Sequence, residues 1–94
     1  MEKYLIVIEK AKSNYSAFSP DVWGCVATGA TVEETLSQMK GALQMHLESM
    51  VSDGEDVPRA RGIAAHIADG VFEPGEIAEH YFITEVEIAV PQHA

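Results

Sequence analysis

The fold is decided by residues 19–34, which read Ser19-Pro20-Asp21-Val22-Trp23-Gly24-Cys25-Val26-Ala27-Thr28-Gly29-Ala30-Thr31-Val32-Glu33-Glu34. Pro20 and Gly24 bracket a turn, and the apolar residues after it favour a short strand over residues 25–28. A capping box follows, in which the Thr31 hydroxyl can accept the Glu34 N–H and the Glu34 carboxylate can accept the Thr31 N–H. A turn, a strand and a sharply capped helix are therefore expected in this order.

The helical pattern continues for many residues beyond this cap. Apolar side chains recur at every third or fourth position, which places them on one stripe: Val32, Leu36, Met39, Leu43, Leu47 and Met50. Gly54, after Asp53, can supply the left-handed residue that ends a helix. We predict one long helix between Thr31 and Gly54, packed by its apolar stripe against a sheet.

Three further segments have strand patterns. Tyr4–Ile8 is continuously apolar, which is typical of a strand buried on both faces. Residues 14–18 should pair antiparallel with it after a turn at residues 10–14. In the last strand, residues 82–90, two sets of side chains face opposite ways: Phe82, Thr84, Val86, Ile88 and Val90, against Ile83, Glu85, Glu87 and Ala89. Pro91 ends this strand.

The order strand-strand-strand-helix-strand predicts a two-layer α+β domain, with the long helix on one face of a small sheet. We expect the first strand to be central and the last strand to join it by a right-handed crossover through the helix, so that the spatial order is third, second, first, last. Pro58 should end the exit loop, and Ile63 and Ile67 suggest a short helix closed by Gly70. Pro74-Gly75 predicts a turn.

The central strand raises the question of what covers the second face of the sheet. Leu5 and Val7 lie opposite to Tyr4, Ile6 and Ile8, so one of the two sets needs a cover other than the long helix. We expect solvent or another copy of the chain on that face. A homodimer through the sheet is the preferred arrangement.

The chain's size and charge narrow the function. Its 94 residues fit a single domain, 1–94, and its net charge of −9, from 15 acidic and 6 basic residues, repels nucleic acids and anionic membranes but attracts a basic protein. Cys25 is the only cysteine, which excludes an internal disulfide and fits a reducing cytoplasm. The apolar run Leu5–Ile8 is too short for a signal peptide or a membrane span, so a soluble protein is expected.

The sequence contains no G-x-S-x-G, H-E-x-x-H, Walker or G-x-G-x-x-G motif, and its four histidines lack metal-ligand spacing. No cofactor is expected, and Cys25 fits a small core residue better than a nucleophile. A metal-dependent nuclease is one alternative, because this order of elements also begins the ribonuclease H topology. Glu85 and Glu87, two residues apart on one strand face, could then share a metal with Glu9. The same spacing is typical of any solvated strand face.

Two large apolar residues are not used by the predicted core. Trp23 lies in the expected turn, and Met45 lies on the back of the long helix. The centres of protein interfaces favour such side chains, and acidic neighbours would meet a basic partner. The candidate partner-binding residues are therefore Asp21, Trp23, Met45, Glu85 and Glu87.

Several motifs, in this order, resemble the HicB family of bacterial antitoxins: Tyr15-Ser16-Ala17-Phe18, Pro20-Asp21, Gly24-Cys25-Val26-Ala27-Thr28-Gly29, Thr31-Val32-Glu33-Glu34 and Asp53-Gly54-Glu55-Asp56-Val57-Pro58. The resemblance covers residues 3–58, and the last strand fits the same architecture. It implies a truncated ribonuclease H-like fold without nuclease activity. The implied partner is HicA, a small basic ribonuclease toxin with a fold like that of double-stranded-RNA-binding domains. The surplus of acidic residues agrees with such a partner.

The chain also departs from this family pattern. Many relatives carry a C-terminal helix-turn-helix or ribbon-helix-helix segment, whereas this chain ends at Ala94, so direct DNA binding is not expected. Val22-Trp23 stands where relatives often have leucine and proline, and residues 59–80 form a longer connection. The leading hypothesis is an antitoxin-like, non-catalytic protein that occludes a HicA-type toxin. The alternative is a stand-alone dimeric binding module of the same fold with a different partner or ligand.

Overall fold

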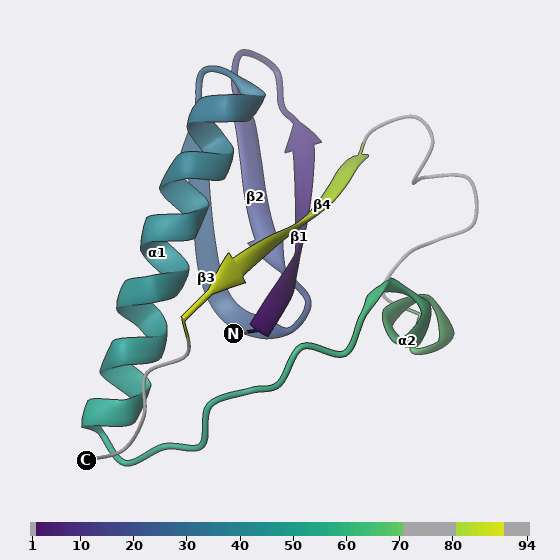
Figure 1. Cartoon of the computed structure of the whole chain (residues 1–94). Coiled ribbons are helices and arrows are strands. Elements are labelled where there is room, and N and C mark those ends of the chain that lie inside the picture. Colours follow the sequence, from purple (N-terminus) through teal and green to yellow (C-terminus); the bar gives the residue numbers. More distant parts are fainter. Residues whose placement is uncertain (1, 71–80, 90–94) are drawn as a thin grey trace.

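The structure, a computed structural model, describes residues 2–70 and 81–89 (Figure 1). Its elements in chain order are β1 (Glu2–Lys10), β2 (Tyr15–Ser19), β3 (Val22–Gly29), α1 (Val32–Ser52), α2 (Ile63–Ala68) and β4 (Tyr81–Ile88). The predicted turn at Pro74-Gly75 and the predicted end of the last strand at Val90 and Pro91 lie outside the described residues. The two-layer α+β fold class is confirmed, with α1 lying along one face of the sheet.

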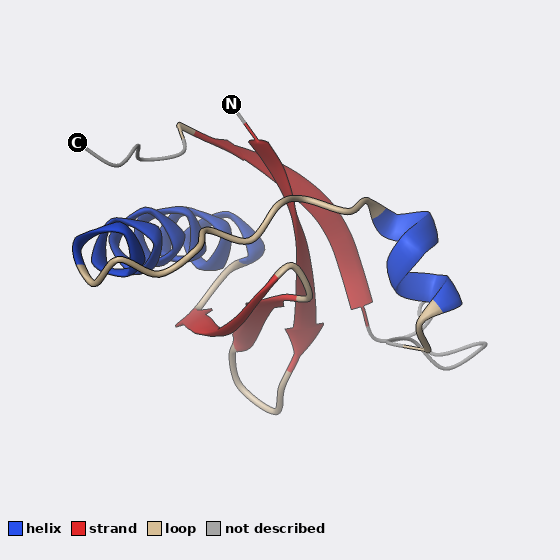
Figure 2. Ribbon diagram, turned by 90° about the horizontal axis from the view of Figure 1, so that it is seen from below, coloured by secondary structure: helices blue, strands red, loops and turns tan. Residues whose placement is uncertain are grey.

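The four strands form one sheet in the order β3-β2-β1-β4, as predicted. The expected right-handed crossover is wrong, because that connection joins parallel strands and β4 runs antiparallel to β1. The two strands pair from Glu2–Ile88 to Glu9–Tyr81. After α1 the chain crosses to the other side of the sheet, where α2 lies (Figure 2). β4 begins at Tyr81, opposite Glu9 near the end of β1, and therefore runs back along β1.

The third strand begins three residues earlier than predicted. Ser19 and Val22 are cross-strand partners, so the β2–β3 turn is tight, and Trp23 lies in β3 and not in the turn. The register shifts between Phe18 and Ser19, and Gly24 has φ of 87°. A residue in the left-handed region is typical of a bulge, which allows β3 to start early and still rejoin the ladder.

The long helix has the expected limits. Thr31 is its N-cap and accepts the backbone N–H of Glu34 at 3.0 Å, while the Thr35 hydroxyl donates to the Thr31 carbonyl at 2.7 Å. At the other end Gly54 has φ of 76°, directly after the C-cap Asp53. The side chains most deeply buried along α1 are Thr35, Met39, Leu43 and Leu47. Local capping and periodicity therefore determine this element.

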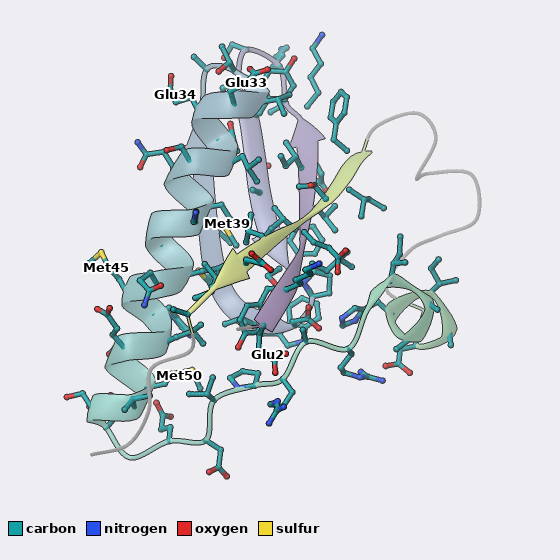
Figure 3. All side chains as sticks on the ribbon, in the orientation of Figure 1. Glu2, Glu33, Glu34, Met39, Met45 and Met50 are labelled. Atoms are coloured by element: carbon teal, nitrogen blue, oxygen red, sulfur yellow. The ribbon has the colours of Figure 1, made fainter. Side chains whose placement is uncertain are left out.

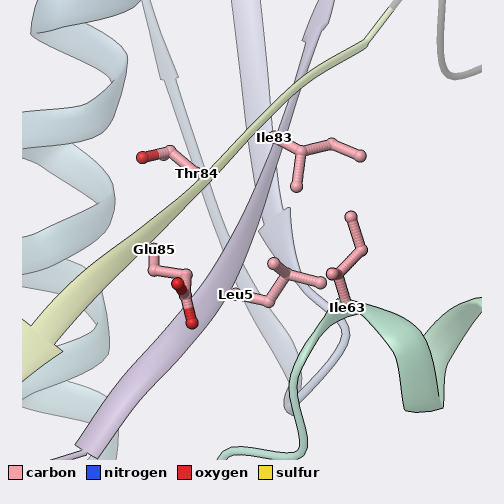
Figure 4. A pocket seen from close by; sticks show the side chains of 5 residues that line it. All are labelled: Leu5, Ile63, Ile83, Thr84 and Glu85. Carbon is pink, nitrogen blue, oxygen red and sulfur yellow. The ribbon is translucent and has the colours of Figure 1, made fainter.

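The core has one main part between α1 and the sheet. Its buried members from the sheet are Tyr4, Ile6, Ile8, Ala17, Val22, Cys25, Val86 and Ile88. A second, smaller cluster lies on the other face, where Leu5 and Val7 pack with Phe18 and Ile83. Leu5 and Val7 are only 2% and 0% exposed within a single chain, so our expectation that solvent or another copy alone would cover this face is wrong. Part of the cover comes from α2, whose Ile63 lies beside Leu5 (Figure 4).

The path from α1 to α2 is held to the sheet by several contacts. The Tyr4 hydroxyl donates to the Pro58 carbonyl at 2.7 Å, and burial raises the pKa of this hydroxyl. The Glu2 carboxylate accepts one hydrogen bond from the Arg59 guanidinium at 2.8 Å and another from the Ala60 N–H at 3.1 Å. These bonds place α2 against the face opposite α1. Neither helix in residues 2–70 and 81–89 combines the length and apolar content needed to cross a membrane.

Candidate functional site

The face of the sheet opposite α1, here called the open face, carries most of the candidate residues. The antiparallel register sets Leu5 opposite Glu85 and Lys3 opposite Glu87, so both glutamates lie on the side of Leu5 and Val7. The alternation predicted for β4 is confirmed, because Val86 and Ile88 join the core on the α1 side. Glu85 and Glu87 are exposed. The open face therefore presents carboxylates beside a small apolar cluster.

Trp23 extends this face at the β3 edge of the sheet. Its ring stacks on Phe18, with centroids 6.3 Å apart and planes 15° from parallel, and Phe18 belongs to the open-face cluster. Trp23 remains 69% exposed, and Val26, on the partner position of Phe18, is 68% exposed. Large exposed apolar side chains close together are typical of protein contact surfaces.

Between β4 and α2 the open face contains a hollow of about 320 Å³, lined by Leu5, Ile63, Ile83, Thr84 and Glu85 (Figure 4). Leu5, Ile63 and Ile83 give it an apolar surface, and the Glu85 carboxylate lies at its rim. Sequence reasoning missed this hollow, because Ile63 comes from α2 and the pattern of the short helix did not indicate which face it would cover.

Asp21 does not belong to the exposed surface. Its side chain is fully buried, and its Oδ2 atom accepts the Leu5 N–H at 2.9 Å. Its Oδ1 atom accepts the Arg61 N–H at 3.0 Å and lies 2.6 Å from His66 Nε2. A carboxylate in this position links β1 to α2 and offers no free oxygen to a partner. We therefore remove Asp21 from the candidate contact residues.

Met45 lies on the other side of the molecule. Its side chain is 72% exposed and points away from the sheet on the back of α1 (Figure 3). Trp23 and Glu85 lie on the open face, opposite α1, so one small partner surface cannot touch all three. The predicted set therefore splits into an open-face group, Trp23, Glu85 and Glu87, and the isolated Met45.

The open-face acids do not converge on one point. Glu9 pairs with Tyr81 across the β1–β4 ladder, four residues along the strand from the Leu5–Glu85 pair, which is about 13 Å at the usual strand rise. Within residues 2–70 and 81–89, no group of three or more His, Cys, Asp or Glu side chains is placed to hold a metal ion. The three acids of the nuclease alternative are thus spread along the strands.

Cys25 is a buried residue of the main core. Burial raises the pKa of its thiol, which disfavours the thiolate that nucleophilic chemistry requires. Its position therefore agrees with the packing role expected from the sequence.

Comparison with known proteins supplies the context for this geometry. A family model described as "HicB_like antitoxin of bacterial toxin-antitoxin system" matches residues 4–90. A 14.9 kDa protein of Haemophilus phage HP1 is 38% identical over 64 residues, covering 68% of this chain and 48% of the phage protein. A UPF0150 protein of Thermoplasma acidophilum is 33% identical over 67 residues, covering 68% of this chain and 97% of its own length. The match thus spans about half the length of the phage relative.

Solved structures show the same fold. The antitoxin HicB of Burkholderia pseudomallei superposes with a TM-score of 0.77 at 22% identity, over 100% of this chain and 67% of that one. A chain of the HicA3 and HicB3 toxin-antitoxin complex gives a TM-score of 0.69 at 23% identity, over 90% and 95% of the two chains. These structures show the shared fold, and the family match over residues 4–90 shows that the chain belongs to the HicB-like antitoxin family of bacterial toxin-antitoxin systems.

Proposed function

We propose that this protein is an antitoxin that binds a small basic ribonuclease of the HicA kind and covers the surface by which that toxin binds RNA. The match to the antitoxin family carries the proposal, and the fold shared with a HicA3 and HicB3 complex supports it. The binding surface is the open face, with Trp23 as an apolar anchor and Glu85 and Glu87 as acidic contacts. Inhibition is steric and electrostatic, and the antitoxin itself catalyses no reaction.

The charge of the open face supports a basic partner. Along β1 and β4, the charged residues on this side are Glu9, Glu85 and Glu87 against Lys3. The whole chain carries a net charge of −9. An acidic surface of this kind accelerates association with a cationic RNA-binding surface and competes with the phosphates of its substrate.

The proposal has two further parts. We expect the protein to act in the cytoplasm, where a toxin of this kind would meet RNA. We expect no direct binding to DNA, because the net charge of −9 opposes the approach of phosphates.

Co-expression with the product of the reading frame adjacent to its gene tests the function, and we expect that product to be a small basic protein of the HicA kind. The two proteins should elute together in size exclusion, and growth arrest by the toxin should be relieved. Because exposed charges are screened by salt, the dissociation constant should rise several-fold between low and high ionic strength. Separate elution together with unrelieved growth arrest would refute the proposal.

A homodimeric binding module with a different partner is the second candidate. Trp23 and Val26 favour it, because they are 69% and 68% exposed in the single chain and belong to the edge strand β3. The burial of Leu5 and Val7 within one chain removes the original reason for a dimer, so the prediction now rests on this patch. Light scattering at micromolar concentration measures the oligomeric state and tests this candidate. A monomer that also fails to bind the toxin would contradict both candidates.

A further inference from the structure

The hollow between β4 and α2 combines an apolar floor with one carboxylate at its rim. Leu5 forms the floor and is 2% exposed, while Ile63 and Ile83 form the walls. Its volume of about 320 Å³ is at the lower end of the range of roughly 300–1,000 Å³ typical of ligand pockets. The hollow is therefore large enough to receive an apolar side chain of a partner.

Glu85 differs from its neighbour Glu87 in the charge that faces it. Glu87 lies opposite Lys3 in the β1–β4 ladder, whereas Glu85 lies opposite Leu5. Among the described residues, no ion pair within 4 Å involves either glutamate, so the difference between them is the cross-strand neighbour alone. Arg61 lies two residues before the start of α2, and its guanidinium is paired with the Asp69 carboxylate at 2.6 Å. The Glu85 carboxylate is exposed at the rim, where a basic side chain of a partner can approach it.

We propose that this hollow receives one apolar side chain of the toxin, and that a Lys or Arg of the toxin next to that side chain pairs with Glu85. The inference rests on the proposed function and specifies its anchor point. Buried apolar anchors beside charge pairs are the usual form of interface hot spots. A basic toxin fits this site better than a second copy does, because another copy would bring its own net charge of −9 to an acidic rim.

The test fills the hollow by the substitution Ile63→Trp and uses Ile67→Trp as a matched control. Both residues lie on α2 and are comparably exposed, at 41% and 49%, but only Ile63 lines the hollow. The probe is the co-expressed HicA-type toxin, titrated by calorimetry. Ile63→Trp should weaken binding on the order of tenfold or more, the typical worth of burying one large aliphatic side chain, and Ile67→Trp by less than about threefold.

A second pair of variants tests the rim. Glu85→Gln should weaken binding by about twofold to fivefold, the range of a partly exposed ion pair, and should reduce its salt dependence. Glu87→Gln should have a smaller effect, because Lys3 already faces that carboxylate. In methyl NMR spectra of the unmodified chain, the toxin should shift the signals of Leu5, Ile63 and Ile83, which needs no substitution in α2.

The outcomes separate the two levels of the proposal. If the unmodified chain binds the toxin and Ile63→Trp binds as tightly as Ile67→Trp, or if the three methyl signals do not move, the inference is wrong and the antitoxin function stands. If the unmodified chain does not bind the toxin at all, both are wrong. If it associates with itself and only Ile63→Trp abolishes this, a second copy occupies the hollow, which overturns the inference.

Discussion

The substitution Asp21→Ala should destabilise this protein far more than its single charge suggests. The carboxylate accepts the Leu5 N–H at 2.9 Å and the Arg61 N–H at 3.0 Å, and it lies 2.6 Å from His66 Nε2. Both side chains of the Asp21–His66 pair are almost completely buried. Alanine removes the acceptor and leaves without a partner the buried Leu5 N–H, the buried His66 ring and the part-buried Arg61 N–H.

The expected cost follows from these contacts. Each orphaned buried donor costs about 1–3 kcal/mol, and breaking a buried pair by removing one member costs about 3–5 kcal/mol in total. We expect a loss of about 3–5 kcal/mol from the free energy of unfolding. A domain of this length has roughly 5–14 kcal/mol available. Asp69→Ala is the matched control, because its pair with Arg61 is about half exposed on both sides and should be worth less than about 1 kcal/mol.

Urea denaturation measures the difference, with Trp23, the only tryptophan, as a fluorescent reporter. With an m value of about 1.5 kcal/mol/M, Asp21→Ala should lower the urea midpoint by about 2–3 M. The midpoint of Asp69→Ala should stay within about 0.7 M of the unmodified protein. If the two variants unfold within about 1 kcal/mol of each other, the carboxylate does not hold α2 to the sheet as described here.

Two further predictions concern the core. An added Cβ at Gly29 would lie 2.6 Å from Thr35 Oγ1 and 2.7 Å from the Thr35 backbone nitrogen, so Gly29→Ala should lower the free energy of unfolding by about 1–3 kcal/mol. A Cβ at Gly41 on α1 would meet nothing within 4 Å, so Gly41→Ala should raise the free energy of unfolding by about 0.5–1 kcal/mol. Thermal melts compare the two, and equal shifts would contradict the close approach of β3 to α1. Because burial raises the pKa of the Cys25 thiol, its alkylation by iodoacetamide at pH 8 should be about tenfold or more slower in the folded protein than in urea. Equal rates would show that the thiol is open to solvent.

The parts of the fold that sequence predicted well depend on local patterns. The limits of α1 follow from the Thr31 cap and Gly54, and the facing of β4 follows from a strict alternation. The same alternation placed Glu85 and Glu87 on one side of the sheet. The cap and the alternation both lie within the elements that they specify, so the helix limits and the strand facing depend little on contacts with distant segments.

The wrong predictions concern the direction of β4, the burial of Asp21 and the position of Trp23. The direction of β4 depends on the end of β1 at which the segment after α1 returns to the sheet. Neither Pro58 nor the Ile63–Ile67 spacing specifies that end. The burial of Asp21 depends on His66, which lies 45 residues away, and no local pattern couples the two. Trp23 was expected in a turn because Gly24 follows it, but the positive φ of Gly24 forms a bulge within β3.

The anchoring of Asp21 also determines where the length of this chain can change. Tyr4, Glu2 and Asp21 fasten residues 58–61 to the sheet, so residues inserted at the exposed Glu55 and Asp56 would only lengthen the loop ahead of these anchors. One residue inserted between Arg61 and His66 would instead turn His66 by about 100° around α2 and away from Asp21. Tolerance to insertion should therefore change abruptly at Pro58.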